Sequence, residues 1–194
     1  MLFRLLLLTI FLLHFSQMAI ATPHVGDRAP EFQFVDIDGK KGHTHSSKDG
    51  ISILFFVGLD SVERLEEDLA GLDIQIIQAH PNAQISYLNF ADLRSVPSLF
   101  QDMAGQVMQI MNNRIKADIE ENYRTNNVQE AAANTTIQLI PDWSGAHLDA
   151  FGLQNADQFS CWIISNGRII GYLPEGTDNL TEKYLSIIDE ALTN

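Results

Sequence analysis

The chain has a single cysteine, Cys161, among its 194 residues. One thiol excludes an intrachain disulfide framework, a zinc site built from cysteines and a Cys-x-x-Cys redox centre. Basic residues are also scarce: 12 lysines and arginines stand against 25 aspartates and glutamates, for a net charge of −13. This acidic excess opposes binding to nucleic acid or to an anionic membrane. Hydrophobic residues make up 45% of the chain, so we expect one globular domain with a core.

A long apolar run occupies the N-terminus. Arg4 is the only charge in residues 1–21, the apolar core extends from Leu5 to Phe15, and Ala19-Ile20-Ala21 follows. This pattern predicts a secretory signal peptide cleaved after Ala21. The alternative is an uncleaved anchor, but that apolar core is shorter than the ~20 residues that a spanning helix needs. We therefore expect a periplasmic or secreted protein, with residues 22–194 as a single domain and no membrane span after cleavage.

Short apolar runs alternate with segments of helical periodicity along the remaining chain, which indicates a mixed sheet with helices on both faces. Asn166-Gly167 predicts a two-residue hairpin between the last two strands. The expected strands are residues 51–57, 84–90, 137–140, 159–164 and 168–172, and the expected helices are residues 65–76, 98–123, 146–151 and 180–192.

The longest periodic segment, residues 98–123, predicts one helix within an insertion at about residues 95–125. Its apolar side chains recur every three to four residues and form one stripe. A stripe of this kind usually packs on its own domain, and we expect it to be core here; an exposed docking face is the alternative. The stripe comprises Phe100, Met103, Val107, Ile110, Met111, Ile115 and Ile119.

Three segments in the right order carry a family resemblance. VGDRAPEFQFVDIDGK (25–40) resembles the entry to redoxin domains, PDWSGAHLDAFGL (141–153) a later Asp and short helix, and FSCWIISNGRIIGY (159–172) the closing hairpin. Together they resemble the redoxin branch of the thioredoxin-like superfamily, which includes peroxiredoxins and TlpA-like proteins. The resemblance implies an α/β, thioredoxin-like three-layer fold, with a mixed central sheet, helices on both faces and the long helical insertion.

The chain departs from this family where the redox chemistry is expected. In thiol-active relatives a reactive cysteine follows the first central strand at a helix N-terminus, where the helix dipole stabilises a thiolate. Aligned with the TlpA-like pattern, Ser61 takes the place of the first cysteine and Arg64 that of the second, while Gln158 stands about where thioredoxins carry a cis-proline. With Asp60 and Glu63 these residues form what we call the degenerate corner. It is either a retained pocket for a small ligand or peptide, or a capped and solvated helix start.

Cysteine and histidine offer two further candidate sites. Cys161 lies in the middle of the apolar run 159–164, where we expect it to pack as a small hydrophobe; a reactive role is the alternative. His43 and His45 lie on one side of an extended segment and suit copper or zinc, but no ligand set of the usual spacing completes the pair. The sequence therefore predicts no cofactor.

A polar and aromatic cluster contains Asp142, Trp143, His147 and Asp149. An Asp–His pair can serve acid–base catalysis, but no nucleophile stands at a matching position. The favoured interpretation is that Asp142 caps the short helix and that Trp143 packs over the sheet edge.

These observations predict an exported thioredoxin-like protein without a redox-active cysteine motif. We expect a non-catalytic binding or interaction protein of the cell envelope, which contacts an unidentified protein or small molecule through the degenerate corner. One alternative is a thiol-dependent antioxidant or redox protein that uses Cys161 alone. A second is a metal-binding module that uses His43 and His45.

Overall fold

The structure is a computed structural model that describes residues 22–44, 50–58, 60–61, 64–65, 69 and 71–193. The expected signal peptide, His45 and Glu63 lie outside the described residues. The signal peptide, the role of His45 as a metal ligand and the place of Glu63 in the degenerate corner therefore stay predictions. Within the described part of the chain, no helix is long and apolar enough to span a membrane.

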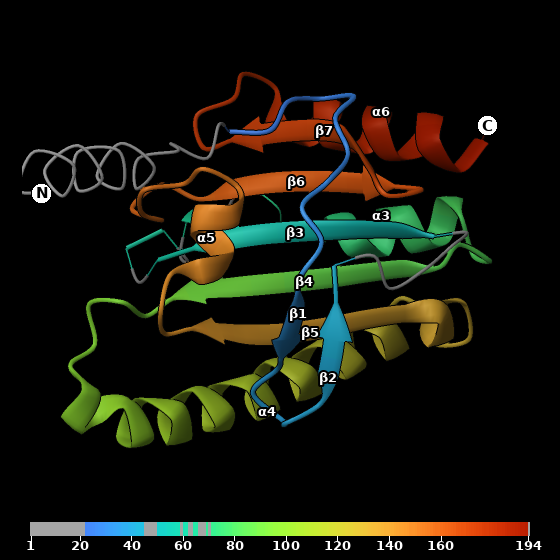
Figure 1. The fold of residues 1–194 in the computed structure, drawn as a ribbon. Coiled ribbons are helices and arrows are strands. Elements are labelled where there is room, and N and C mark those ends of the chain that lie inside the picture. The colour runs from blue at the N-terminus through green and yellow to red at the C-terminus, as the bar shows by residue number, and fades with distance from the viewer. Residues whose placement is uncertain are drawn as a thin grey trace, which may run out of the picture.

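A mixed five-stranded sheet forms the centre of the molecule (Figure 1). The three strands β3, β4 and β5 are parallel, whereas β6 and β7 are antiparallel to their neighbours. This confirms the expected mixed sheet. The strands in spatial order are β5 (Thr135–Asp142), β4 (Ile85–Asp92), β3 (Ile51–Val57), β6 (Ser160–Ser165) and β7 (Arg168–Pro174).

Strand β3 is central and is buried along its whole length, as its apolar run predicts. The hairpin between β6 and β7 turns at Asn166 (φ 50°) and Gly167 (φ 72°). Two consecutive positive φ angles are what a tight hairpin turn requires, so the sequence signal is confirmed.

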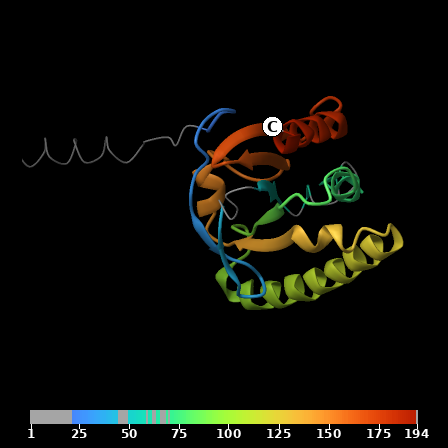
Figure 2. The ribbon, with the colours of Figure 1, turned by 90° about the vertical axis from the view of Figure 1, so that its right-hand side faces the viewer.

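Both faces of the sheet are covered (Figures 1 and 2). Helices α3 (Leu72–Ala79) and α6 (Leu180–Thr193) lie on one face, and α5 (Ala146–Ala150) with the hairpin β1 (Gln33–Val35) and β2 (Lys41–His43) lies on the other. The expected helix at 65–76 is interrupted by Gly71, whose φ is +72°.

The two faces of β6 contribute to separate cores. Cys161 and Ile163 pack in the core beneath α3 and α6, whereas Trp162 and Ile164 pack in the core beneath α5. The alternation follows from the two-residue period of a strand.

Helix α4 (Gln101–Thr125) follows a short 3-10 turn (Ser98–Phe100) and lies at the margin of the molecule beyond β5 (Figures 1 and 2). The expected long helix is therefore confirmed, but the expectation that its apolar stripe is core is wrong. Six stripe residues are exposed, with Ile110 keeping 70% of its surface in water, and only Ile119 is partly buried in a core cluster. The six exposed residues are Phe100, Met103, Val107, Ile110, Met111 and Ile115.

The reason is the polar attachment of α4 to the domain. Asn112 is buried and donates to Asp38 in the β1–β2 turn, and Lys116 forms an ion pair with the same carboxylate. Only the C-terminal part of the helix packs through apolar contacts, where Ile119 and Tyr123 meet Ile77 and its neighbours. Apart from half-buried Met108, the inward positions of the first four turns are polar or small, and the apolar stripe faces solvent.

Candidate functional site

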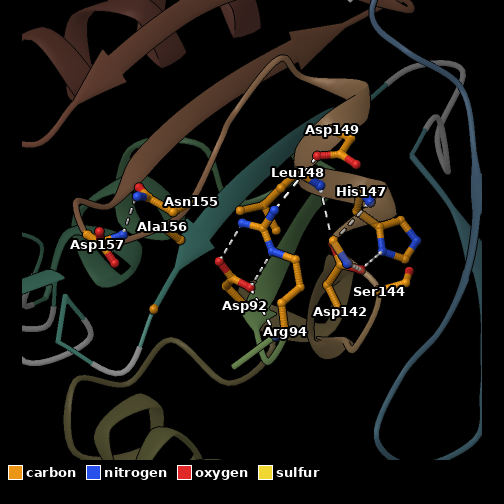
Figure 3. Close-up of polar contacts among 12 residues, drawn as sticks. Asp92, Arg94, Asp142, Ser144, His147, Leu148, Asp149, Asn155, Ala156 and Asp157 are labelled. Atoms are coloured by element: carbon orange, nitrogen blue, oxygen red, sulfur yellow. Dashed lines mark hydrogen bonds and ion pairs between the residues drawn. The ribbon is translucent and has the colours of Figure 1, made fainter. Parts of the chain in front are cut away.

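The carboxyl ends of the parallel strands β3, β4 and β5 meet at one edge of the sheet. Gly58 follows β3, Asp92 ends β4 and Asp142 ends β5. This edge is where ligands usually bind in open α/β sheets. It carries both the degenerate corner and the polar cluster that the sequence singled out. Figure 3 shows Asp142, His147 and Asp149 of the polar cluster.

Ser61 is fully buried at the degenerate corner. Its hydroxyl donates to the Ala156 carbonyl at 3.0 Å and accepts from the Gly58 N–H at 2.9 Å. The Gly58 N–H also donates to the Ala156 carbonyl, and a Cβ built on Gly58 would lie 2.6 Å from that oxygen. The corner is thus closed by a tight backbone contact, and the serine oxygen that replaces the family's thiol is occupied within the protein.

Arg64 is also engaged within the corner. Its Nε donates to Glu175 Oε1 at 2.6 Å and its Nη2 donates to the Asp157 carbonyl at 2.9 Å. Burial raises the pKa of Glu175, but its hydrogen bonds with Arg64 and with the Phe159 N–H outweigh burial and hold that pKa below its ordinary value. The guanidinium therefore fastens the helix start to the end of β7. Asp60 is exposed.

Gln158 is exposed near the same loop, and no cis peptide bond occurs in the described residues. The structure brings Ser61 and Arg64 into contact with residues 156–157. It leaves the side chains of Asp60 and Gln158 in solvent.

The two alternative sites are the thiol of Cys161 and the histidine pair, of which the structure describes His43. Cys161 is buried, and burial raises the pKa of its thiol, so the sulfur is a protonated packing group. His43 is exposed on β2. Among the residues that the structure describes, no three His, Cys, Asp or Glu side chains come close enough to hold a metal ion.

Asp142 caps α5, as the sequence interpretation predicts. Its carboxylate accepts the backbone N–H groups of Gly145 at 2.9 Å, His147 at 3.0 Å and Leu148 at 3.1 Å. The imidazole Nδ1 of His147 lies 3.3 Å from Asp142 Oδ1, off the direction of a good hydrogen bond. Burial raises the pKa of Asp142, but the His147 imidazole and the N–H groups outweigh burial, so the pKa is lowered. The carboxylate is committed to the cap.

A second charged pair at this edge was not found from the sequence. Arg94 forks onto Asp92 with bonds of 2.9 and 2.7 Å, and the hydrogen bond from Arg94 lowers the pKa of Asp92 (Figure 3). The Arg94 side chain also lies directly over Gly145, where an added Cβ would meet it at 2.1 Å. An Asp two residues before an Arg, at the end of an apolar strand, is the only sequence signal for this pair.

Next to this cluster lies a cleft of about 610 Å³. It opens between the β1–β2 turn, the N-terminal half of α4 and the segment after β5. Ligand-binding pockets typically measure about 300–1,000 Å³, so the size is suitable. The sequence did not predict the cleft because its walls come from segments far apart in the chain. The side chains that matter for its chemistry are Gln101, Asp102, Gln106, Gln109, Trp143 and His147.

No family model and no curated protein matches the chain. Its fold is similar to solved structures. A protein assigned as a disulfide isomerase from Bacteroides thetaiotaomicron superposes with TM-score 0.57 at 18% identity, covering 88% of this chain and 91% of that one. BsSco, a member of the Sco family of cytochrome c oxidase assembly proteins, superposes with TM-score 0.54 at 13% identity, covering 88% of this chain and 96% of that one.

A protein assigned as the thiol:disulfide interchange protein DsbE from Chlorobium tepidum gives TM-score 0.54 at 14% identity, with 87% of this chain and 98% of that chain covered. At these identities the likeness concerns the fold.

Proposed function

We propose that this chain, which has a thioredoxin-like fold without the redox cysteine motif, is a non-catalytic binding protein of the cell envelope. It takes a small polar ligand, neutral or cationic, in the cleft beside α4. The observation that carries the proposal is the cleft itself, about 610 Å³ in volume. Thiol chemistry is disfavoured because Ser61 stands at the family's reactive position and Cys161 is buried.

The chemistry of the walls supports this ligand class. Trp143 offers a flat apolar face, and the amides of Gln106 and Gln109 can both donate and accept hydrogen bonds. The lining includes Asp102 and Asp36 but no lysine or arginine, so an anionic ligand would meet no opposite charge there. The Asp36 carboxylate already accepts from residues 38, 40 and 138, which leaves Asp102 as the available carboxylate.

The degenerate corner is the less favourable place for a ligand. The Ser61 hydroxyl and the Arg64 guanidinium are both bonded within the protein. A ligand at the corner would have to break these contacts, and each buried polar group left unpaired costs about 1–3 kcal/mol.

The cell-envelope part of the proposal rests on the signal-peptide pattern of residues 1–21. N-terminal sequencing of the protein recovered from the exported fraction of an expressing bacterium tests it. The expected first residue is Thr22, and a chain that starts at Met1 in the cytoplasm would contradict it.

Binding is tested by tryptophan fluorescence and by NMR titration with spermidine, glucosamine, glucose and citrate. We expect saturable changes at Trp143 with the cationic or neutral probes and none with citrate. Asp102→Asn should weaken binding of a cationic probe about tenfold, as expected for loss of one charge contact. Glu130→Gln is the matched control, because it removes the same charge from an exposed position away from the cleft. No response to any probe, or equal binding of citrate, would overturn the proposal.

Catalysis is tested separately, by insulin reduction and by peroxide consumption. We expect both rates at the level of buffer. A rate well above buffer that disappears in Cys161→Ser would instead support the redox alternative.

A further inference from the structure

The outward side of α4 and of the 3-10 turn before it is unusually apolar for an exposed surface. We call it the outward face, and it presents large apolar side chains to water for about four helical turns. At roughly 100 Å² each, such side chains expose on the order of 700 Å², whereas the largest apolar patch on a monomer is usually about 300–600 Å². Its members are Leu99, Phe100, Met103, Val107, Ile110, Met111 and Ile115.

We propose that the outward face is a homodimer interface, in which α4 packs antiparallel against α4 of a second copy. The two-fold axis passes beside Val107. The inference is independent of the ligand proposed above, because the residues of α4 that line the cleft lie off the outward face.

Five of the seven apolar positions of the outward face are symmetric about Val107, and Ile110 is related to the small apolar Ala104. A two-fold axis there sets Leu99 against Ile115 of the second copy, and Met103 against Met111, with each pair occurring twice. Val107 meets its own counterpart. An interface between two identical copies requires this self-complementarity, whereas an interface with an unrelated partner does not.

Charge also favours an antiparallel second copy. Residues 99–115 carry one acid, Asp102, and one base, Arg114, so the contact region is neutral although the whole chain has a net charge of −13. The same axis places Arg114 opposite Phe100, a cation–π pair. The acidic residues of 118–121 extend past the start of the partner's helix, where the helix dipole favours negative charge. A parallel arrangement would instead set these acids against one another.

The position and extent of the face suit this partner. Helix α4 lies at the margin of the molecule in both views, so a second copy can approach it without displacing another element (Figures 1 and 2). A standard specific interface buries about 800 Å² on each partner, and the outward face supplies most of that area.

The first test is the mass of the purified protein by sedimentation equilibrium over a range of concentrations. We expect a dimer that dissociates on dilution and that tightens as salt rises, because salt screens the repulsion between two acidic chains. Val107→Glu should raise the dissociation constant about a hundredfold or more, since it sets two carboxylates face to face. Asn113→Glu adds the same charge about a third of a turn around the helix from Val107, outside the outward face, and should leave the dimer intact. A protein that is monomeric at all concentrations overturns the proposal.

The second test locates the axis. Because Cys161 is buried, a cysteine introduced on α4 is the single reactive thiol. A short bis-maleimide should crosslink Val107→Cys into a covalent dimer. It should not crosslink Asn113→Cys, whose two copies stand about 18 Å apart along the helix axes. Equal crosslinking of both variants, or of neither, overturns the assignment. Both variants should keep the wild-type melting temperature, because both positions are exposed.

Discussion

The side-chain amide of Asn112 lies 3.4 Å from Asp38 Oδ2, at a buried inward position of α4. In an ordinary amphipathic helix that position holds an apolar residue. Lys116, one turn later, forms an ion pair with the same carboxylate. The middle of the helix is therefore attached through hydrogen bonds and charge to a single acidic residue of the β1–β2 turn, whereas its C-terminal part packs through apolar contacts.

Asp38→Ala should loosen α4. It leaves the buried Asn112 amide without its acceptor, and we expect the free energy of unfolding to fall by about 1–2 kcal/mol. Hydrogen exchange of residues 103–116 should become faster. Asp118→Ala is the control, because it removes an exposed carboxylate from the same helix. Unchanged exchange in Asp38→Ala would contradict the attachment described here.

Gly58→Ala should destabilise the protein by about 1–3 kcal/mol, because the new Cβ would lie 2.6 Å from the Ala156 carbonyl and force the two loops apart. Gly105→Ala is the matched control. Its Cβ meets only Trp143, at an ordinary 3.9 Å, and alanine favours the helix by about 0.5–1 kcal/mol. Thermal melts of the two variants should shift in opposite directions, and equal shifts would show that the close approach at Gly58 has no cost.

Ser61→Ala should cost about 1–3 kcal/mol, because the Gly58 and Ala156 groups lose their hydroxyl partner in a buried place. Ser61→Cys puts a thiol at the family's reactive position but in a fully buried site. We expect that thiol to react with a maleimide only after unfolding. Rapid labelling in the native state would show that the corner opens.

Asp142→Ala should lower stability by about 0.5–2 kcal/mol near neutral pH, the usual range for loss of a helix cap. The pKa of Asp142 is held below its ordinary value of 3.8, so its contribution is present above that pH and is lost as pH falls through the folded-state pKa. Urea unfolding of wild type and variant should therefore differ constantly from about pH 5 to 7 and converge below pH 4. If the free energy of unfolding of Asp142→Ala is still lower than that of wild type at pH 2, the loss of stability comes from packing and not from the ionised cap.

Cys161→Ala should lower the free energy of unfolding by about 1 kcal/mol, through a small void in the core, and should leave any binding unchanged. Wild-type protein should resist thiol reagents until it unfolds. Loss of a cellular function without loss of stability would give Cys161 a chemical role.

Much of the fold follows from local patterns. The apolar run of β3 predicts a central strand, and Asn166-Gly167 predicts the hairpin because few other dipeptides accept two positive φ angles. The alternation around Cys161 predicts that it shares a core with Phe159 and Ile163. Asp142 is identified as a cap by its place just ahead of a short helix. In each case the determining interactions lie within a few residues of one another.

The orientation of α4 could not be obtained in this way. Periodicity shows that a helix has an apolar side, but the side that faces inward depends on what the domain presents to it. Here that surface contains Asp38, which lies 74 residues from Asn112 in the chain. The cleft was missed for the same reason, since Asp36, Gln106 and Trp143 meet only in the folded chain. The Arg94–Asp92 fork is local, but surface pairs of this kind are too common to be informative.

The burial of Cys161 also bears on how the protein responds to its surroundings. With its only thiol inside the sheet and protonated, the folded chain exposes no sulfur from cysteine to glutathione, peroxide or a disulfide exchange partner. The state of this thiol is then the same in a reducing and in an oxidising medium. The fraction of oxidised Cys161 in the folded protein should therefore not change with the ratio of reduced to oxidised glutathione. The protein can then serve as a control beside proteins whose cysteines respond to that ratio.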